Sequence, residues 1–340
     1  MIPFPVDAEL LGASAADLGA LAHAAEDAGF SRLWAPELYR SATIPLAVAA
    51  AATERIEIAT GIALAFTRSP FVLALEALDL DELSGGRMVL GLGAGVRRLN
   101  QRWHAVSAYD PPVPRMRDHI AAFREIVSAL AAGRDARSEG QYVDIHVAGY
   151  RRQLATTRDR IPVWLAAVMP GMAGLAGEVA DGFLDHPITT PDWLRDRLLP
   201  PIRAGAERAD RATPEVAGGL VAAASAQDPN AARQAAACTV GFYATVKTYE
   251  ALFQAHGFDA RLGEIRRAFM DGGAARLADA VGEEMTDQFA AAGTPDQVRK
   301  RALAYTGIVD RLWVTPPHHL QSPEQTSLWQ RGILETFRRP

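Results

Sequence analysis

The stretch Asp79–Gly95, DLDELSGGRMVLGLGAG, decides the fold of this 340-residue chain. An amphipathic helix over 71–83 ends at Ser84-Gly85-Gly86, and the apolar segment Met88–Leu92 that follows at once predicts a strand. The strand runs into Gly93-Ala94-Gly95, where small residues let the backbone approach a ligand. A helix, a glycine stop, a strand and a glycine-lined strand end form half of a β/α unit, in which binding loops follow the carboxyl end of the strand.

The rest of the chain repeats this alternation of strand and helix. Short apolar segments rich in valine, isoleucine, leucine and alanine predict eight strands, separated by segments of helical periodicity. The predicted strands are Ile2–Val6, Ser31–Ala35, Arg55–Phe66, Met88–Leu92, Ile161–Ala167, Gly182–His186, Glu215–Ala224 and Val309–Thr315. Eight buried strands joined by helical crossovers predict a parallel sheet closed into an α/β, (β/α)8 TIM barrel, with 1–340 as a single domain.

Two segments exceed the minimal barrel. Ser138–Arg160 is expected to form a β-rich excursion before strand five, and Asp228–Gly293 to form several helices between strands seven and eight. Insertions at the carboxyl ends of barrel strands enclose and shape active sites.

Composition excludes several classes of function. A net charge of -5 and a pI of about 5.9 argue against nucleic-acid and anionic-membrane partners. The N-terminal residues lack the features of a signal peptide and no apolar run reaches membrane-spanning length, so a soluble, cytoplasmic protein is expected. Cys238 is the single cysteine, which rules out an intramolecular disulfide and a thiolate metal cluster.

Ionisable side chains follow three of the predicted strands. Glu37 and Tyr39 follow strand two, and Glu37 can either bind substrate or cofactor or neutralise Arg40. His186 closes strand six, where a histidine can act as a general acid or substrate ligand, or simply hydrogen-bond a loop. His318-His319 follows strand eight, but no HxH or HExxH spacing is present, so no metal site is expected.

The glycines of GLGAG, residues 91–95, have GxGxG spacing rather than the GxGxxG of dinucleotide-binding loops. A nicotinamide site is therefore disfavoured. In a barrel, Gly93, Ala94 and Gly95 are expected to line the pocket floor beside a cofactor or substrate; the alternative is a tight strand-to-loop turn with no ligand.

A resemblance to a known family is carried by segments distributed over essentially the whole chain. They are AHAAEDAGFSRLWAPE (22–37), LDELSGGRMVLGLGAG (80–95), IPVWLAA (161–167), GEVADGF (177–183) and AAGTPDQVRKR (291–301). These segments resemble the bacterial-luciferase-like superfamily of flavin and deazaflavin enzymes. The long helical insertion, with FYATVKTYEALFQAHGF (242–258), is most similar to the deazaflavin-dependent branch that includes methylenetetrahydromethanopterin reductase.

The resemblance implies coenzyme F-420, an 8-hydroxy-5-deazaflavin, as cofactor, with FMN as the alternative. It places the cofactor ring on a bulge late in strand three with a non-prolyl cis peptide bond, formed here by Thr60, Gly61, Ile62 and Ala63, with Gly61–Ile62 as the cis bond. A plain trans strand is the alternative. It also places the cofactor phosphate at the turn Ala167, Val168 and Met169, where helix N–H groups bind anions.

The chain departs from the family pattern at three places. Leu38 stands where flavin-dependent relatives often have histidine, which argues against mechanisms that need an imidazole there. Val96 replaces the acid of the branch that oxidises glucose 6-phosphate. Many relatives have glycine in the turn that contains Val168 and Met169 here.

The resemblance as a whole implies an oxidoreductase that moves a hydride between F-420 and a small organic substrate, with Glu37, Tyr39 or His186 handling the accompanying proton. The alternatives are an FMN-dependent monooxygenase and, from another class, a cofactor-free binding protein on the same barrel. A homodimer is also expected from the resemblance.

Overall fold

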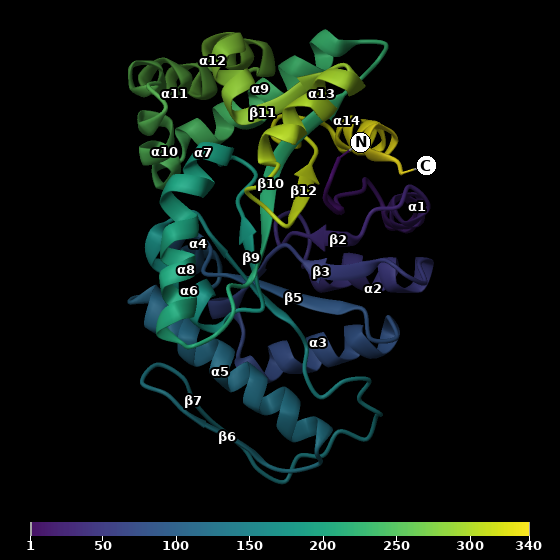
Figure 1. The fold of residues 1–340 in the computed structure, drawn as a ribbon, viewed down its shortest axis with the longest axis vertical. Helices are drawn as coiled ribbons and strands as arrows, with labels where there is room; N and C mark the ends of the chain where they lie inside the picture. Colours follow the sequence, from purple (N-terminus) through teal and green to yellow (C-terminus); the bar gives the residue numbers. More distant parts are fainter. Residues whose placement is uncertain (1, 340) are drawn as a thin grey trace. The chain divides into compact units, whose positions relative to one another are not determined.

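The computed structural model describes residues 2–339, and its strands and helices alternate along the chain (Figure 1). Eight parallel strands surrounded by helices form the closed (β/α)8 barrel predicted from the sequence. The eight positions are taken by β1, β2, β3 with β4, β5, β8, β9, β10 and β12. Among the described residues, no helix is both long enough and apolar enough to cross a bilayer.

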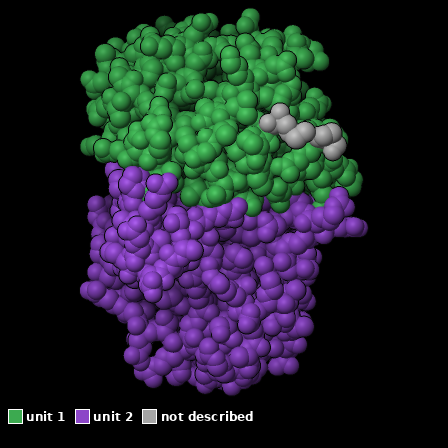
Figure 2. All heavy atoms as spheres, in the orientation of Figure 1, with its two compact units in different colours: residues 1–31, 185–199, 216–340 green, residues 32–184, 200–215 purple. Residues whose placement is uncertain are grey.

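The contacts within the chain define two compact units, shown in separate colours in Figure 2. Unit 1 comprises the chain up to Ser31, Asp185–Leu199 and the chain from Val216, and unit 2 comprises Arg32–Leu184 and Pro200–Glu215. Each unit draws on separated segments, so neither is a contiguous domain in sequence. The single domain over 1–340 stays an expectation.

Unit 2 contains neighbouring parallel strands in the order β2-β3-β5-β8, followed by β9. Leu33 pairs with Ile58, Ile58 with Met88, and Leu90 with Val163. Its strands are β2 Arg32–Ala35, β3 Glu57–Thr60, β4 Ala63–Leu64, β5 Met88–Gly93, β6 Ala136–Glu139, β7 Asp144–Val147, β8 Val163–Ala167 and most of β9 Gly182–Asp185. Its helices are α2 Thr43–Ala52, the 3-10 turn Ala65–Thr67, α3 Pro70–Leu83, α4 Arg97–Trp103, α5 Pro112–Ala131, α6 Pro170–Val179 and most of α8 Leu199–Arg208.

Local sequence explains why β5 follows α3 so closely. Ser69 caps α3 by accepting a hydrogen bond from the Val72 amide at 3.2 Å, with Pro70 in the first turn. After the helix ends, Arg87 donates to the carbonyl oxygens of Ile56 and Thr53 at 2.7 Å and 2.8 Å. The arginine of SGGR therefore joins the start of β5 to the loop that precedes β3.

The core of unit 2 is built around two tryptophans. The rings of Trp34 on β2 and Trp164 on β8 meet edge to face, with centroids 5.5 Å apart. The buried guanidinium of Arg32 lies 4.5 Å from the Trp164 ring centroid and binds Glu57 at 2.7 Å, so its charge is compensated.

Unit 1 contains the parallel strands β1, β12, β10 and β11, adjacent in that order. A buried ion pair between Asp7 and Arg311, 3.0 Å apart, joins β1 to β12. The strands are β1 Val6–Glu9, most of β10 Glu215–Ala224, β11 Ala290–Gly293 and β12 Arg311–Thr315. The helices are α1 Ala15–Asp27, α7 Pro191–Trp193, the π-helical turn Leu194–Leu198, α9 Pro229–Thr245, the 3-10 turn Lys247–Tyr249, α10 Glu250–Ala255, the 3-10 turn Asp259–Arg261, α11 Leu262–Met270, α12 Ala274–Phe289, α13 Pro295–Ala302, the 3-10 turn Leu303–Tyr305 and α14 Pro323–Phe337.

Two of the predicted strands differ clearly from the structure. The first strand is Val6–Glu9 rather than Ile2–Val6, because Pro3 and Pro5 have no N–H group for a strand ladder. The predicted strand Arg55–Phe66 is divided into β3, β4 and a 3-10 turn.

The insertion Asp228–Gly293 is helical as predicted except at its end. There Ala290–Gly293 forms β11, which pairs with β10 in parallel. The excursion before strand five contains the antiparallel pair β6–β7, and the chain after β7 has no further strand until β8.

Candidate active site

The third strand of the barrel is interrupted at Gly61 and Ile62, which separate β3 from β4; we call these two residues the strand-three break. The peptide bond between them is cis, as predicted. Backbone hydrogen bonds hold the break against the end of β2, since the Gly61 amide donates to the Ala35 carbonyl at 2.7 Å and the Glu37 amide to the Ile62 carbonyl at 3.2 Å. Gly61 and Ile62 are half-buried, and since Gly61 has no side chain, part of its backbone remains accessible.

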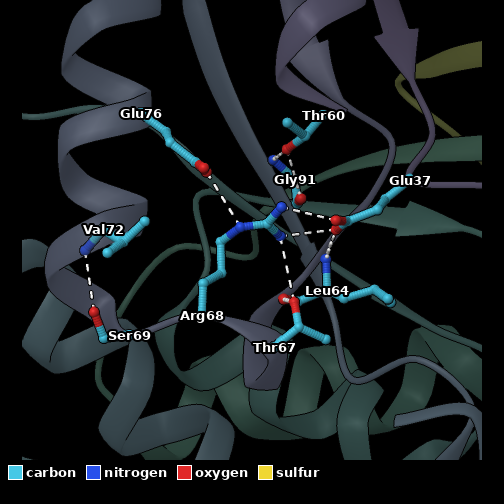
Figure 3. Close-up of polar contacts among 9 residues, drawn as sticks. All are labelled: Glu37, Thr60, Leu64, Thr67, Arg68, Ser69, Val72, Glu76 and Gly91. Carbon is cyan, nitrogen blue, oxygen red and sulfur yellow. Dashed lines mark hydrogen bonds and ion pairs between the residues drawn. The ribbon is translucent and has the colours of Figure 1, made fainter. Parts of the chain in front are cut away.

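The side chain of Glu37 reinforces the same contact (Figure 3). Its Oε2 accepts hydrogen bonds from the Leu64 amide and from Arg68 Nη1, both at 2.8 Å, and its Oε1 accepts from Arg68 Nη2 at 2.7 Å. Arg68 Nε also lies 3.2 Å from the Glu76 carboxylate on α3. The cation paired with Glu37 is thus Arg68 and not the neighbouring Arg40.

These contacts determine the charge on Glu37. Burial disfavours the ionised carboxylate, but the hydrogen bonds from Arg68 and Leu64 outweigh burial and hold the pKa of Glu37 below its ordinary value. The same pair raises the pKa of Arg68. Glu37 is therefore a saturated carboxylate at neutral pH, arranged to hold the chain around the break.

Two glycines of β5 allow the strand-three break to pack closely against β5. Thr60 Oγ1 donates to the Gly91 carbonyl at 2.7 Å and accepts from the Gly91 amide at 2.9 Å. A Cβ added at Gly91 would lie 2.0 Å from the Thr60 carbonyl oxygen, and one added at Gly93 would lie 2.1 Å from Ile62 Cδ1. Packing against Thr60 and Ile62 thus explains why both positions are glycine. Contact of Gly93 with a cofactor stays a prediction.

The loop after β5 is held by side-chain hydrogen bonds. Asn100 Nδ2 donates to the Ala94 carbonyl at 3.0 Å, and the Tyr109 hydroxyl donates to the Gly95 carbonyl at 2.8 Å. Gly95 has a φ of 64°, a conformation that favours glycine.

Apolar side chains are exposed just beyond the strands of unit 2. Leu38 follows β2 and is 51% exposed, Val96 follows β5 and is 37% exposed, and Met169 follows β8 and is 46% exposed. Tyr39 is 65% exposed. Because the carboxyl ends of neighbouring parallel strands lie at one edge of a sheet, these residues belong to the same edge as the break.

The predicted phosphate turn precedes an uncapped helix. Ala167 and Val168 are half-buried, and Met169 is the N-cap residue of α6, which receives no side-chain cap. The first N–H groups of α6, from Gly171 onward, are therefore without a side-chain cap.

His186, the third predicted catalytic residue, lies in unit 1 directly after β9. The Ile188 amide donates to its Nδ1 at 3.2 Å, and its Nε2 lies 3.1 Å from the Tyr249 hydroxyl. Desolvation, together with the neighbouring His318, lowers the pKa of His186 to about 3, so the ring is neutral at physiological pH.

Two buried carboxyl groups of unit 1 were not predicted from the sequence. Glu9 at the end of β1 accepts from Thr315 Oγ1, and Asp185 at the end of β9 accepts from Thr189 Oγ1 and from the His186 amide. Burial raises the pKa of each to about 8, so both are protonated at neutral pH. An acidic residue at the end of an otherwise apolar strand is the sequence signal that could have identified both.

His318 and His319 lie together after β12, and His319 stacks on Phe242 with ring centroids 3.7 Å apart. Burial lowers their pKa values, to about 4 for His318 and to about 2 for His319. Across residues 2–339, no three or more histidine, cysteine, aspartate or glutamate side chains are grouped so that they could hold a metal ion.

Comparison with known proteins relates most of the chain to one family. Residues 1–311 match the family model described as luciferase-like monooxygenase. An uncharacterized protein of Mycobacterium tuberculosis is 32% identical over 308 residues, which cover 85% of this chain and 86% of that protein. The 5,10-methylenetetrahydromethanopterin reductase of Methanolobus tindarius is 29% identical over 281 residues, 82% of each chain.

Among solved structures, the coenzyme F-420 dependent tetrahydromethanopterin reductase of Methanopyrus kandleri matches with a TM-score of 0.82. The match covers 98% of this chain and 99% of that one at 24% sequence identity, a likeness that establishes the fold. The family model extends over most of the chain, including every strand from β1 to β11. The chain therefore belongs to the luciferase-like monooxygenase family.

Proposed function

We propose that this protein is an oxidoreductase that transfers a hydride between coenzyme F-420 and a small organic substrate. Support comes from the family, from the similarity to a methylenetetrahydromethanopterin reductase, and from the fold shared with a coenzyme F-420 dependent reductase. The geometric observation that carries the proposal is the mainly apolar surface at the carboxyl ends of the strands in unit 2.

Around the strand-three break, the polar side chains are directed into the protein. Thr60 is bonded to Gly91, and Glu37 to Arg68 and Leu64 (Figure 3). Accessible at this edge are part of the backbone of the break, the apolar side chains of Leu38, Val96 and Met169, and the ring of Tyr39. Such a surface suits a flat, uncharged ring system and is unsuited to binding a metal ion.

The remainder of a phosphorylated cofactor also has a matching feature. The uncapped amino end of α6 offers N–H groups and a partial positive charge, which favour a phosphate. A Cβ at Gly171 would meet only Val113 Cγ2, at 3.8 Å, so the space beside the Gly171 Cα is open. We assign Thr60, Gly61, Ile62 and Ala63 to the ring, Gly93, Ala94 and Gly95 to its neighbourhood, and Ala167, Val168 and Met169 to the phosphate.

The bound deazaflavin would supply the hydride chemistry, and the protein would supply orientation and exclusion of water. Glu37 is ionised and hydrogen-bonded to Arg68, and His186 is neutral and hydrogen-bonded to Tyr249. We therefore assign both residues a role in positioning their neighbours rather than in proton transfer. Tyr39, with its exposed ring, is the proposed site of proton exchange on unit 2.

Titration of the purified protein with F-420 and FMN, followed by cofactor fluorescence, tests the proposal. We expect F-420 to bind at least about tenfold more tightly, a difference of about 1.4 kcal/mol. Equal or reversed preference would contradict the choice of F-420.

The rival with specific support is an FMN-dependent monooxygenase, because the family is described as luciferase-like monooxygenase and a monooxygenase of the same fold has been solved with FMN. Oxygen consumption with reduced FMN, absent with reduced F-420, would favour it. Failure of both cofactors to bind a folded protein would favour the cofactor-free binding protein. The homodimer stays a prediction, for which light scattering of the purified protein gives the mass.

A further inference from the structure

The direction of the hydrogen bond between His186 and Tyr249 follows from the other contact of the His186 ring. The Ile188 N–H group donates to His186 Nδ1 at 3.2 Å, so Nδ1 is an acceptor. In a neutral imidazole the other nitrogen then carries the hydrogen. His186 Nε2–H therefore donates to the Tyr249 hydroxyl oxygen across 3.1 Å.

This direction leaves the hydrogen of the Tyr249 hydroxyl for another acceptor. Within residues 2–339, His186 is the hydrogen-bond partner of this hydroxyl, and the Tyr249 oxygen is the acceptor in that bond. Burial raises the pKa of Tyr249 well above its ordinary value, which keeps the phenol protonated. Tyr249, whose side chain is half-buried, thus combines a fixed acceptor contact with an O–H hydrogen whose acceptor is not His186.

The surroundings of the pair are aromatic and uncharged. The Tyr243 ring lies edge-on to His186 and Tyr249, at centroid distances of 4.9 Å and 5.2 Å. Tyr243 also contacts His319, which stacks on Phe242. A hydrogen bond is stronger in an environment of low polarity than in water, and these rings favour a planar ligand without formal charge.

We propose that the Tyr249 hydroxyl donates a hydrogen bond to a carbonyl oxygen or imine nitrogen of the substrate, and that His186 is the residue that positions this hydroxyl. The inference rests on the proposed function for the existence of a small organic substrate. It adds a substrate-recognising residue, supplied by the insertion between β10 and β11, and a substrate class, an uncharged planar molecule with an acceptor atom.

Two probes of nearly the same shape test the role of Tyr249. Acetophenone carries a carbonyl oxygen where isopropenylbenzene carries a methylene group. Their affinities are measured by ligand-observed NMR on the wild-type protein, with and without F-420. We expect acetophenone to bind about three- to tenfold more tightly, as expected for one net hydrogen bond.

The variants separate this role from a structural one. Tyr249→Phe should abolish the preference, while the matched change Tyr243→Phe should retain it. His186→Ala should reduce the preference, and His186→Gln, whose side-chain amide can donate in place of Nε2–H, should restore part of it. Nitrogen NMR of labelled histidine should show His186 neutral with hydrogen on Nε2.

Equal affinities in the wild type, undetectable acetophenone binding, a preference that survives in Tyr249→Phe, or hydrogen on Nδ1 of His186 would each overturn the inference. The proposed function is judged separately by F-420 binding to the wild type. Binding of F-420 without discrimination between the probes would refute the role of Tyr249 alone.

Discussion

Glu37 and Arg68 form a bidentate ion pair that joins the end of β2 to the chain just after β4. Arg68 Nη2 lies 2.7 Å from Glu37 Oε1 and Arg68 Nη1 lies 2.8 Å from Oε2. Each side chain is only 14% exposed, so the pair is better shielded from solvent than ordinary surface pairs. Removing one partner would leave a mostly buried charge beside the strand-three break.

Coupling between Glu37 and Arg68 should be measurable by a double-mutant cycle. We expect Glu37→Gln and Arg68→Met each to lower the free energy of unfolding by about 2–3 kcal/mol, because Arg68→Met leaves Glu37 without its cation and Glu37→Gln leaves Arg68 with only the single ion pair to Glu76. The double variant should lose clearly less than the sum, as measured by urea unfolding. The exposed pair Arg195–Asp196 serves as control, where no measurable coupling is expected. Additive losses at Glu37 and Arg68 would contradict the assignment.

The stability contribution of Glu37 should also depend on pH. Its pKa is lowered in the folded protein, so the contribution is present above the ordinary glutamate value of 4.5 and is lost as the pH falls through the folded pKa. The difference between wild type and Glu37→Gln should therefore shrink on acidification. A difference that stays constant down to strongly acidic pH would show that the carboxylate charge is not its cause.

Glu9 should show the opposite pH dependence. Burial raises its pKa from 4.5 to about 8, so unfolding releases a proton between these values and stability falls as the pH rises. The variant Glu9→Gln cannot ionise, and we expect it to exceed the wild type by about 1–3 kcal/mol near pH 8, with little difference near pH 4.5. Thermal unfolding across this range measures the effect. Glu335→Gln, an exposed change on α14, should leave the pH profile unaltered, and a Glu9→Gln profile parallel to wild type would refute the burial argument.

Gly91 and Gly93 should differ in their tolerance of alanine. At Gly91 the new Cβ would collide with the Thr60 backbone carbonyl, whereas at Gly93 it would meet the flexible end of Ile62. We expect Gly91→Ala to cost about 3 kcal/mol or more and Gly93→Ala about 1 kcal/mol in urea unfolding. Shortening the second side chain, as Ile62→Val, should rescue Gly93→Ala and leave Gly91→Ala unchanged. Equal costs, or rescue of both variants, would mean that the break does not impose the glycines.

The proposed phosphate contact at α6 can be tested by adding a negative charge. Gly171→Asp should weaken F-420 binding at least about tenfold relative to Gly171→Asn, through repulsion of the cofactor phosphate. The phosphate-free riboside of the same deazaflavin should bind both variants equally. Fold stability should not fall, because an acidic residue in the first helical turn is favourable. Equal weakening for both ligands would place the phosphate elsewhere.

Local signals in the sequence predicted several features correctly. The helix over 71–83 and the strand at Met88–Leu92 are formed as predicted, because each depends on residues close together in the sequence. The position of the strand-three break followed from the family resemblance. β11 was missed because Ala290–Gly293 contains no branched or aromatic residue and becomes a strand only beside β10.

The hydrogen-bond and ion-pair partners of the site residues could not be predicted from the sequence. Glu37 pairs with Arg68, one of 35 basic residues in the chain, and nothing in local spacing distinguishes it from Arg40. Likewise, the pairing of His186 with Tyr249 depends on an insertion 63 residues further along the chain.

The order of hydrophobic segments and glycine stops determined that this chain forms an eight-stranded barrel and, for most strands, where the carboxyl ends lie. Each of those signals acts between residues a few positions apart. Only the tertiary structure decided which carboxyl groups are charged: Glu37 is ionised beside Arg68, while Glu9 and Asp185 are protonated. Burial and the distance to an opposite charge set the protonation state, and both arise when distant segments pack together.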